Sequence, residues 1–143
     1  MPTRKTLTPE QKKKLASGKC VMTGCNGKLD KYRIICYKCK TKLYRLRHPV
    51  NFYYNQLKKG SKRRCIKFTL TLDQFEQFCF DTNYIQKVEK CADGYSLDRI
   101  DVKKGYEFGN LQVLTLSENS KKRHEVDYSK EDRYFEEEKE VKF

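Results

Sequence analysis

The chain has 143 residues, enough for one domain or two small modules, and 36% of them are charged, with a net charge of +13. No apolar run approaches the roughly 20 residues that span a bilayer, and the basic N-terminus lacks the apolar stretch of a secretory signal. These features exclude a membrane protein and predict a cytoplasmic one. The seven cysteines then belong to a reducing compartment, where clustered cysteines more often hold metal than form disulfides.

The positive charge is concentrated in the first half of the chain. Residues 1–64 contain 19 Lys and Arg against 2 Asp and Glu, whereas residues 65–124 contain 9 of each kind. A solvated lysine-rich surface is one interpretation, but solubility alone does not require one sign of charge in one half. Cations meet phosphates and aromatic rings stack on bases, so we expect a nucleic acid as partner. Five tyrosines are interleaved with this charge: Tyr32, Tyr37, Tyr44, Tyr53 and Tyr54.

Residues 1–48 are predicted to form an N-terminal helix and a metal module. Thr8 followed by Pro9 is typical of a helix start, and Gly18 is expected to stop that helix. Turn signals follow, and residues 32–35 are predicted to form a strand. His48, which stands before a proline that begins the next helix, is interpreted as a boundary more than as a substitute metal ligand.

Four cysteines in this module predict a structural zinc site. They form two close pairs, and each pair on a tight turn brings two thiolates together without a large core. A closed set of four ligands leaves no position for water, so the metal is expected to be structural and not catalytic. The spacing resembles zinc ribbons, although its first gap of four residues is wider than the usual two. The ligands are Cys20, Cys25, Cys36 and Cys39.

Residues 49–94 are predicted to form a basic helical region. A helix is expected over residues 50–63, and the basic cluster at its end is a candidate nucleic-acid contact, although part of it also suits the helix dipole. A strand is expected over residues 66–70, and Thr71 with Gln74 predicts a capping box for a third helix. Residues 82–94 are predicted to be irregular. The basic cluster is Lys58, Lys59, Lys62, Arg63 and Arg64.

The buried face of the third helix is expected to contain Leu72, Phe75, Phe78 and Cys79. The cysteines that remain outside the four-cysteine set each stand near apolar residues and are interpreted as packing residues. They are Cys65, Cys79 and Cys91.

Residues 95–124 predict a strand, a loop, a second strand and a helix, which makes the fold class a small α+β one. Asp98 and Asp101 stand at the end of the first strand, Asn110 opens the second, and Asn119 lies on the helix. Carboxylate and amide oxygens at these joints suit a single divalent metal, and such a site suits cutting a phosphodiester. The alternative is that the acids are turn residues and Asn119 faces solvent.

The segment at 95–123 resembles the HNH endonucleases of the His-Me finger (ββα-metal) class. It is most similar to small phage and mobile-element members that join an N-terminal zinc ribbon to a Ser-Leu-Asp-Arg-Ile-Asp, Lys-Gly-Tyr and Gly-Asn pattern, here at 96–101, 104–106 and 109–110. The resemblance implies that Asp98 and Asn119 hold Mg²⁺ or Mn²⁺ and that Asn110 pins the loop. It places the catalytic base, a histidine in the family, at Arg99.

Arg99 departs from the family pattern. A guanidinium stays charged at cellular pH and cannot accept a proton, although it can bind phosphate or stabilise developing charge. If the chain cuts, the metal or Asp101 has to activate the water. We rate His124 as a poor alternative base, because it lies five residues after Asn119 and so points away on a helix.

Two functions therefore remain open from the sequence. One is a metal-dependent endonuclease, phage-encoded and acting on DNA in preference to RNA, with Lys103 and Lys104 as further nucleic-acid contacts. The other is a non-catalytic DNA- or RNA-binding protein, such as a phage structural or host-takeover protein, in the bacterial cytoplasm or the virion. Residues 125–143, with 4 basic and 8 acidic residues, are predicted to form a mobile tail that suits a protein partner.

Overall fold

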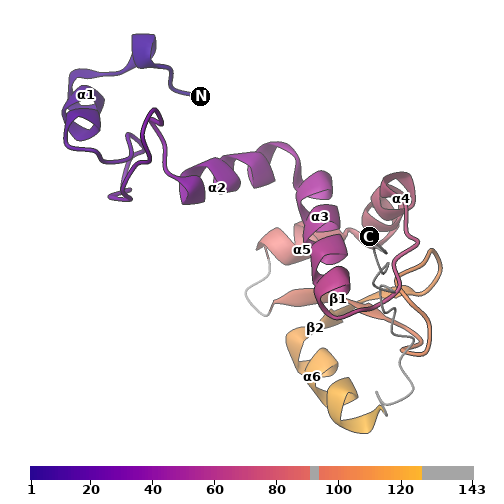
Figure 1. Ribbon diagram of the computed structural model, residues 1–143. Helices are drawn as coiled ribbons and strands as arrows, with labels where there is room; N and C mark the ends of the chain where they lie inside the picture. The colour runs from indigo at the N-terminus through magenta and orange to yellow at the C-terminus, as the bar shows by residue number, and fades with distance from the viewer. Residues whose placement is uncertain (91–93, 127–143) are drawn as a thin grey trace, which may run out of the picture. The chain divides into compact units, whose positions relative to one another are not determined.

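The computed structural model describes residues 1–90 and 94–126, and Figure 1 shows their helices and strands. The chain folds into two compact units, Met1–Pro49 and Val50–Phe143. The predicted α+β class is confirmed: a four-cysteine cluster lies near the N-terminus, helices follow, and a C-terminal β-hairpin packs on a helix. The acidic tail predicted at 125–143 lies outside the described residues from position 127 onward.

The N-terminal unit begins with a 3-10 turn, η1 (Arg4–Thr6), and helix α1 (Pro9–Ala16). The predicted helix start is confirmed, because Thr8 Oγ1 accepts a hydrogen bond from Gln11 N at 3.3 Å and Thr8 N donates one to Gln11 Oε1 at 3.0 Å. This reciprocal pair satisfies two backbone donors that the first turn leaves unpaired. The helix ends before Gly18, whose φ of +69° is a left-handed conformation that glycine adopts without strain.

The segment between α1 and the next helix contains turns and one bridge, Lys19 with Lys28. The strand predicted at residues 32–35 is wrong. Tyr32 has a φ of +77° and is 80% exposed, so the chain turns at that residue instead of extending. One backbone hydrogen bond connects this segment to the first cysteine turn: Val21 N donates to Ile34 O at 3.1 Å.

Helix α2 (Tyr37–Arg47) is an element that the sequence patterns did not predict. Its N-cap is Cys36, which makes no side-chain capping bond, so the usual Ser, Thr, Asp or Asn signal for a helix start is missing. The helix ends at His48, its C-cap, which is where a boundary was expected.

Three described helices lie between α2 and the hairpin: α3 (Pro49–Arg63), α4 (Leu72–Thr82) and α5 (Tyr84–Lys90). The helix predicted over residues 50–63 and the capping box at Thr71 are confirmed. The irregular segment predicted at 82–94 is wrong for residues 84–90, which form α5, while residues 91–93 lie outside the described part of the chain. Asn83, at a left-handed φ of +53°, ends α4 and lets α5 begin at once.

An aromatic cluster joins these helices. Phe75 on α4 is fully buried, and its ring lies 5.7 Å from that of Tyr54 on α3 and 6.2 Å from that of Tyr84 on α5. Tyr54 also donates its hydroxyl hydrogen to Leu70 O at 2.9 Å, which satisfies the polar end of a largely apolar side chain. Cys79 is buried beside Phe75, as expected for the inner face of α4.

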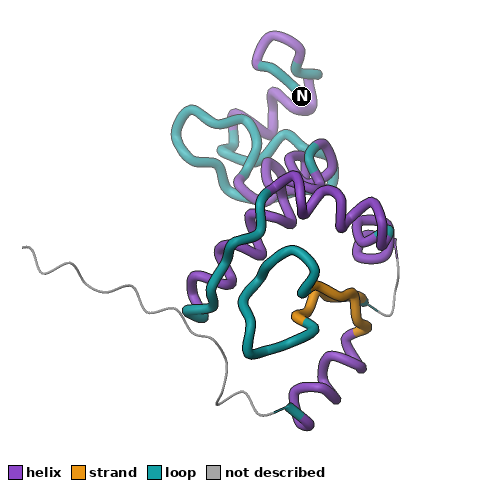
Figure 2. Tube along the Cα trace, turned by 90° about the vertical axis from the view of Figure 1, so that its right-hand side faces the viewer, coloured by secondary structure: helices purple, strands orange, loops and turns teal. Residues whose placement is uncertain are grey.

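The hairpin pairs β1 (Tyr95–Arg99) with β2 (Leu111–Thr115) in antiparallel register, so that Asp98 lies opposite Gln112. Helix α6 (Leu116–Glu125) follows directly and packs on both strands. The long loop between the strands, residues 100–110, stands out in Figure 2. Strand, loop, strand and helix therefore occur in the expected order.

The strand predicted at residues 66–70 is wrong as a regular element, because the segment contains isolated bridge positions instead of a continuous strand; one of these bridges joins Phe68 to Tyr106. Around this bridge Tyr106 N donates to Lys67 O at 2.8 Å, and Leu70 N donates to Tyr106 O at 3.1 Å. The hairpin loop thus lies directly against this extended segment. Gly105 permits the close approach, since a Cβ there would stand 2.3 Å from Lys67 O.

We expect Gly105→Ala to destabilise the C-terminal unit by about 1–3 kcal/mol, because the added methyl group overlaps a backbone carbonyl that cannot move aside without breaking the bridge. The matched control is Gly60→Ala on α3, where a Cβ meets only Arg64 Nη2 at 3.7 Å. That change should stabilise the protein by about 0.5–1 kcal/mol through helix propensity. Urea unfolding followed by circular dichroism measures both, and equal values would contradict the close packing.

Candidate metal centre and nucleic-acid surface

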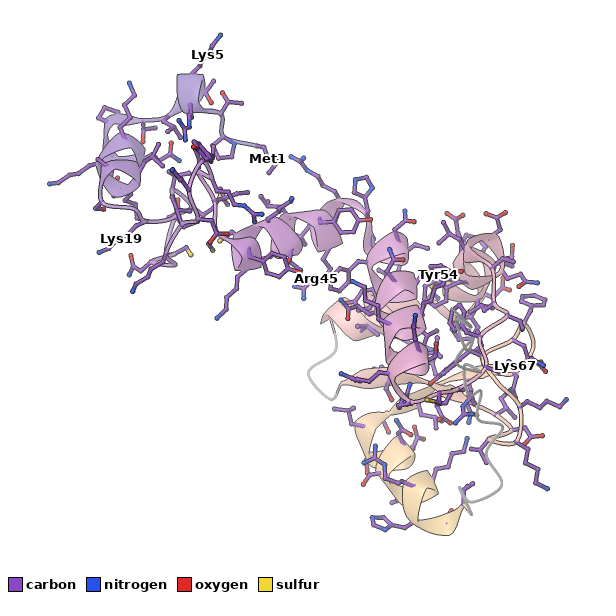
Figure 3. The ribbon with its side chains drawn as sticks, in the orientation of Figure 1. Met1, Lys5, Lys19, Arg45, Tyr54 and Lys67 are labelled. Atoms are coloured by element: carbon purple, nitrogen blue, oxygen red, sulfur yellow. The ribbon has the colours of Figure 1, made fainter. Side chains whose placement is uncertain are left out.

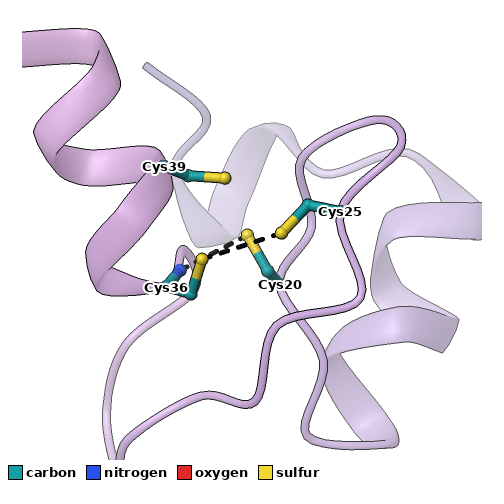
Figure 4. Close-up of side chains that lie close together, drawn as sticks. All are labelled: Cys20, Cys25, Cys36 and Cys39. Atoms are coloured by element: carbon teal, nitrogen blue, oxygen red, sulfur yellow. Dashed lines mark hydrogen bonds between the residues drawn. The ribbon is translucent and has the colours of Figure 1, made fainter.

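The side chains of Cys20, Cys25, Cys36 and Cys39 converge, as Figure 4 shows, with their sulfur atoms within 4.8 Å of one another. Cys25 Sγ and Cys36 Sγ are 3.7 Å apart. Four thiolates around one zinc at about 2.3 Å place neighbouring sulfurs about 3.8 Å apart, so the observed spacing fits a tetrahedral site. Within the described residues, no other group of three or more His, Cys, Asp and Glu side chains converges in this way.

Two turns and a helix start position the sulfurs. Gly24 has a φ of +71° in the turn before Cys25, and a Cβ on Gly27 would stand 3.0 Å from Cys36 Sγ. Cys36 is the N-cap of α2, and Cys39 lies in its first turn. A helix N-terminus carries partial positive charge, which favours thiolates.

Backbone N–H groups donate hydrogen bonds to two of the sulfurs. Cys36 N donates to Cys20 Sγ at 3.3 Å, and Gly27 N donates to Cys25 Sγ at 3.4 Å. The backbone N–H of Cys39, more than the neighbouring thiols, lowers the pKa of Cys36 to about 7, whereas burial and the neighbouring sulfurs raise the pKa of Cys39 to about 12. Neighbouring thiolates repel one another, so a divalent cation is what stabilises the full set. The four cysteines therefore fit a structural zinc ion.

Lys14 supports this centre from α1, a role that no sequence pattern predicts. Its ammonium donates to Met22 O and to Cys25 O, each at 3.0 Å, across the first cysteine turn. A lysine in a strongly basic stretch looks like any solvated charge, so only the folded chain distinguishes this one.

Asn110 holds the hairpin loop together. It is 5% exposed; its Oδ1 accepts a hydrogen bond from Asp101 N at 2.8 Å, and its Nδ2 donates to Asp101 O at 3.0 Å and Gly105 O at 2.9 Å. The side chain thus uses its amide oxygen and both amide hydrogens on loop backbone. These bonds connect residues 101, 105 and 110 of the hairpin loop to one another.

Asp98 faces a cation supplied by the chain itself. Its Oδ2 lies 2.5 Å from Lys122 Nζ of α6 and accepts a second hydrogen bond from Gln112 Nε2 at 3.0 Å. The Lys122 ammonium also donates to Arg99 O and, at 3.3 Å, to Ile100 O. Three oxygens therefore surround this ammonium, which occupies the position beside Asp98 where a metal ion bound by that carboxylate would lie.

Arg99 is buried, at 4% exposure. Its Nη1 donates to Val102 O at 3.1 Å and to Lys104 O at 3.0 Å, and its guanidinium carbon lies 5.4 Å from the centre of the Tyr106 ring. These contacts tie the end of β1 to the first half and the middle of the hairpin loop. In this structure the guanidinium binds backbone carbonyls of its own loop.

The three remaining candidate residues of the hairpin and α6 have separate surroundings. Asn119 Nδ2 donates to Ser96 Oγ at 3.0 Å, which joins α6 to β1. Asp101 Oδ1 accepts a hydrogen bond from Lys103 N at 2.9 Å in a local turn. His124 is exposed near the end of α6. The structure thus brings Asp98 to Lys122 and Asp101 to Asn110, whereas Asp98 and Asn119 are hydrogen-bonded to other residues and not to each other.

The basic cluster at the end of α3 separates into two groups. Arg64 donates to Tyr106 Oη at 3.0 Å and to Gly60 O at 3.1 Å, so it holds the hairpin loop against α3. Lys58, Lys59 and Lys62 line a hollow of about 920 Å³. Lys67, labelled with Tyr54 in Figure 3, lines the same hollow from the segment after α3. It was not among the contacts predicted from the sequence.

Lys103 and Lys104, the further predicted contacts, are exposed on the hairpin loop, and Arg63 is exposed at the end of α3. Among the described helices, none is both long and apolar enough to cross a membrane. Comparison of the chain with protein-family models, curated proteins and solved structures finds no match.

Proposed function

We propose that this chain is a zinc-containing nucleic-acid-binding protein, acting on DNA in preference to RNA, in which an HNH-like finger serves as a scaffold and does not cut. The observation that carries the binding part is the group of lysines around the hollow beside α3, where none of the described lining residues is acidic. A phosphate backbone is the partner that complements such a surface. The reducing cytoplasm of a bacterial host suits the four thiols.

The contacts of the finger favour binding without cleavage. A divalent ion at Asp98 has to displace the Lys122 ammonium, which already neutralises that carboxylate. The residue at the position of the family base, Arg99, is buried and bonded to loop carbonyls, so it neither accepts a proton nor reaches a substrate. Each position expected to carry chemistry thus has a structural partner.

The second candidate is the metal-dependent endonuclease. It is favoured by Asn110, whose hydrogen bonds to Asp101 and Gly105 hold the loop as the resemblance to HNH enzymes implies. In that case Asp98 and Asn119 would hold Mg²⁺ or Mn²⁺ after Lys122 moves away, and the metal or Asp101 would activate the water.

A binding and cleavage experiment distinguishes the two. The full chain should bind a fluorescent DNA duplex, and raising salt from about 50 mM to about 200 mM should weaken binding on the order of 10³-fold if several phosphates are contacted. With Mg²⁺ or Mn²⁺, supercoiled plasmid should remain intact with the wild type and with Asp98→Ala alike. Nicking by the wild type that Asp98→Ala abolishes would establish the endonuclease.

Lys122→Met provides the sharper control, because it removes the internal cation and replaces it with an unbranched side chain only one heavy atom shorter. Under the scaffold proposal this variant still leaves the plasmid intact, and the hairpin loses stability because Asp98 loses its charge partner. Under the endonuclease proposal it raises divalent-metal-dependent nicking, since Asp98 becomes available to the ion. Binding that ignores salt would contradict both.

A further inference from the structure

We propose that the hollow beside α3 binds an unpaired nucleotide, with the base over its apolar floor and the adjacent phosphates on its lysines. The hollow lies within the C-terminal unit, between the C-terminal half of α3 and residues 65–69, and has a volume of about 920 Å³. That size is within the range of small-molecule sites and exceeds what one phosphate group fills. This inference rests on the proposed nucleic-acid-binding function and specifies the form of the strand.

The rim of the hollow is cationic from two sides. Lys58, Lys59 and Lys62 come from one end of α3, and Lys67 comes from the segment that crosses the hairpin loop. The side chains of Lys58, Lys59 and Lys67 are exposed, so they keep the reach to meet phosphates on either side of a bound base. Lysine is a point charge with three donors and follows a flexible backbone without demanding a fixed geometry.

The floor of the hollow is apolar and held rigidly. Ile66 is 3% exposed and belongs to the core, and Phe68 packs edge-on against the ring of Tyr54 at 5.6 Å and near that of Tyr106 at 6.1 Å. Charged oxygens lose hydration against such a floor without gaining hydrogen bonds. The flat face of a base, in contrast, is apolar and stacks on aromatic and aliphatic side chains.

A floor and rim of this kind distinguish an unpaired strand from a duplex. In a duplex the bases are stacked inside and only the convex phosphate backbone faces outward. The lysines of the rim can then bind phosphates, but no base reaches the apolar floor. An unpaired nucleotide presents a base and its flanking phosphates together. An acidic peptide supplies the anions but does not place an apolar ring beside each charge, and it is tested below as the competing occupant.

A single introduced tryptophan reports on the hollow alone, because the chain contains no tryptophan of its own. Asn55 is exposed on α3 and lines the hollow, so Asn55→Trp in the full chain places an indole there. We expect oligothymidine and oligouridine to quench this fluorescence at concentrations about tenfold below those of a blunt duplex of the same length, through base stacking. The control is Phe80→Trp on α4, which is 81% exposed, does not line the hollow and should stay unquenched.

Charge reversal at the rim provides the second measurement. Lys58→Glu with Lys67→Glu should weaken single-strand binding at least tenfold more than Lys121→Glu with Arg123→Glu, an equal charge change at exposed positions of α6. Stronger quenching by oligothymidine than by oligouridine supports both this proposal and the preference for DNA, whereas the reverse order supports the hollow as a nucleotide site and overturns the preference for DNA. Equal effects of the two double variants would overturn it.

The remaining outcomes separate failure of this inference from failure of the proposed function. If duplex binds with the expected salt dependence while the tryptophan at position 55 stays silent to single strands, the hollow proposal is wrong and nucleic-acid binding stands. If no nucleic acid binds, both are wrong. If poly-glutamate quenches the Asn55→Trp signal more effectively than oligothymidine, the occupant is an acidic peptide and the nucleotide proposal is overturned.

Discussion

Replacing Cys36 by serine should remove zinc from the protein and unfold the N-terminal unit. Apart from two of the cysteines, the buried residues of that unit are Leu7, Val21 and Ile35, which is too small a core to hold about 50 residues folded without a further constraint. Zinc bound by four thiolates contributes on the order of 10–16 kcal/mol of apparent binding free energy, and that free energy becomes folding free energy. The N-terminal unit should therefore lose nearly all of its folded structure.

Metal analysis and NMR measure this result. The wild type should contain about one zinc per chain, and Cys36→Ser should contain little. Amide resonances of the N-terminal unit should collapse toward random-coil positions. Those of residues 50–90 and 94–126 should persist, because the aromatic core of the C-terminal unit contains none of the four zinc ligands. Cys65→Ser, outside the cluster, is the matched control and should keep both zinc and fold. A zinc-free N-terminal unit that stays folded would show that the cysteines are packing residues.

Asn110→Asp should destabilise the C-terminal unit by about 3 kcal/mol or more, although the two side chains have nearly the same shape. The native amide nitrogen donates to Asp101 O and Gly105 O, and a carboxylate oxygen there would face both carbonyls as a second acceptor. Two acceptors, one buried and one part-buried, lose their donor, at about 1–3 kcal/mol each, and a carboxylate charge is desolvated at a position that is 5% exposed. The loop that carries Gly105 and Tyr106 should loosen with it.

Asn119→Asp makes the same chemical exchange at a site that tolerates it. Asn119 is half-buried and its amide donates only to Ser96 Oγ, a hydroxyl that rotates and donates to a carboxylate instead. We expect a change within about 1 kcal/mol. Urea unfolding gives both values, and hydrogen exchange at Tyr106 N, which donates to Lys67 O, reports the loop directly. Comparable losses in the two variants would mean that Asn110 does not pin the loop.

The sequence by itself determined the features that depend on local chemistry. The Thr8 and Thr71 capping boxes, the left-handed Gly18 and the four-cysteine spacing each need only neighbouring residues to act, so their patterns can be read from the chain. The same holds for the order of strand, loop, strand and helix after residue 94, because the apolar alternation and the turn residues there are local.

Only the tertiary structure decided what the charged and extended residues do. Residues 66–70 have strand propensity, yet they form isolated bridges instead of a regular strand, and at Phe68 the described neighbour is Tyr106 of the hairpin loop. Lys14, Lys67 and Lys122 look alike in a basic sequence, but one ties the cysteine turn, one lines the hollow beside α3 and one neutralises Asp98. Each role depends on which residues from distant parts of the sequence the fold places beside the ammonium group, within about 3 Å for a hydrogen bond. A local sequence pattern does not contain that information.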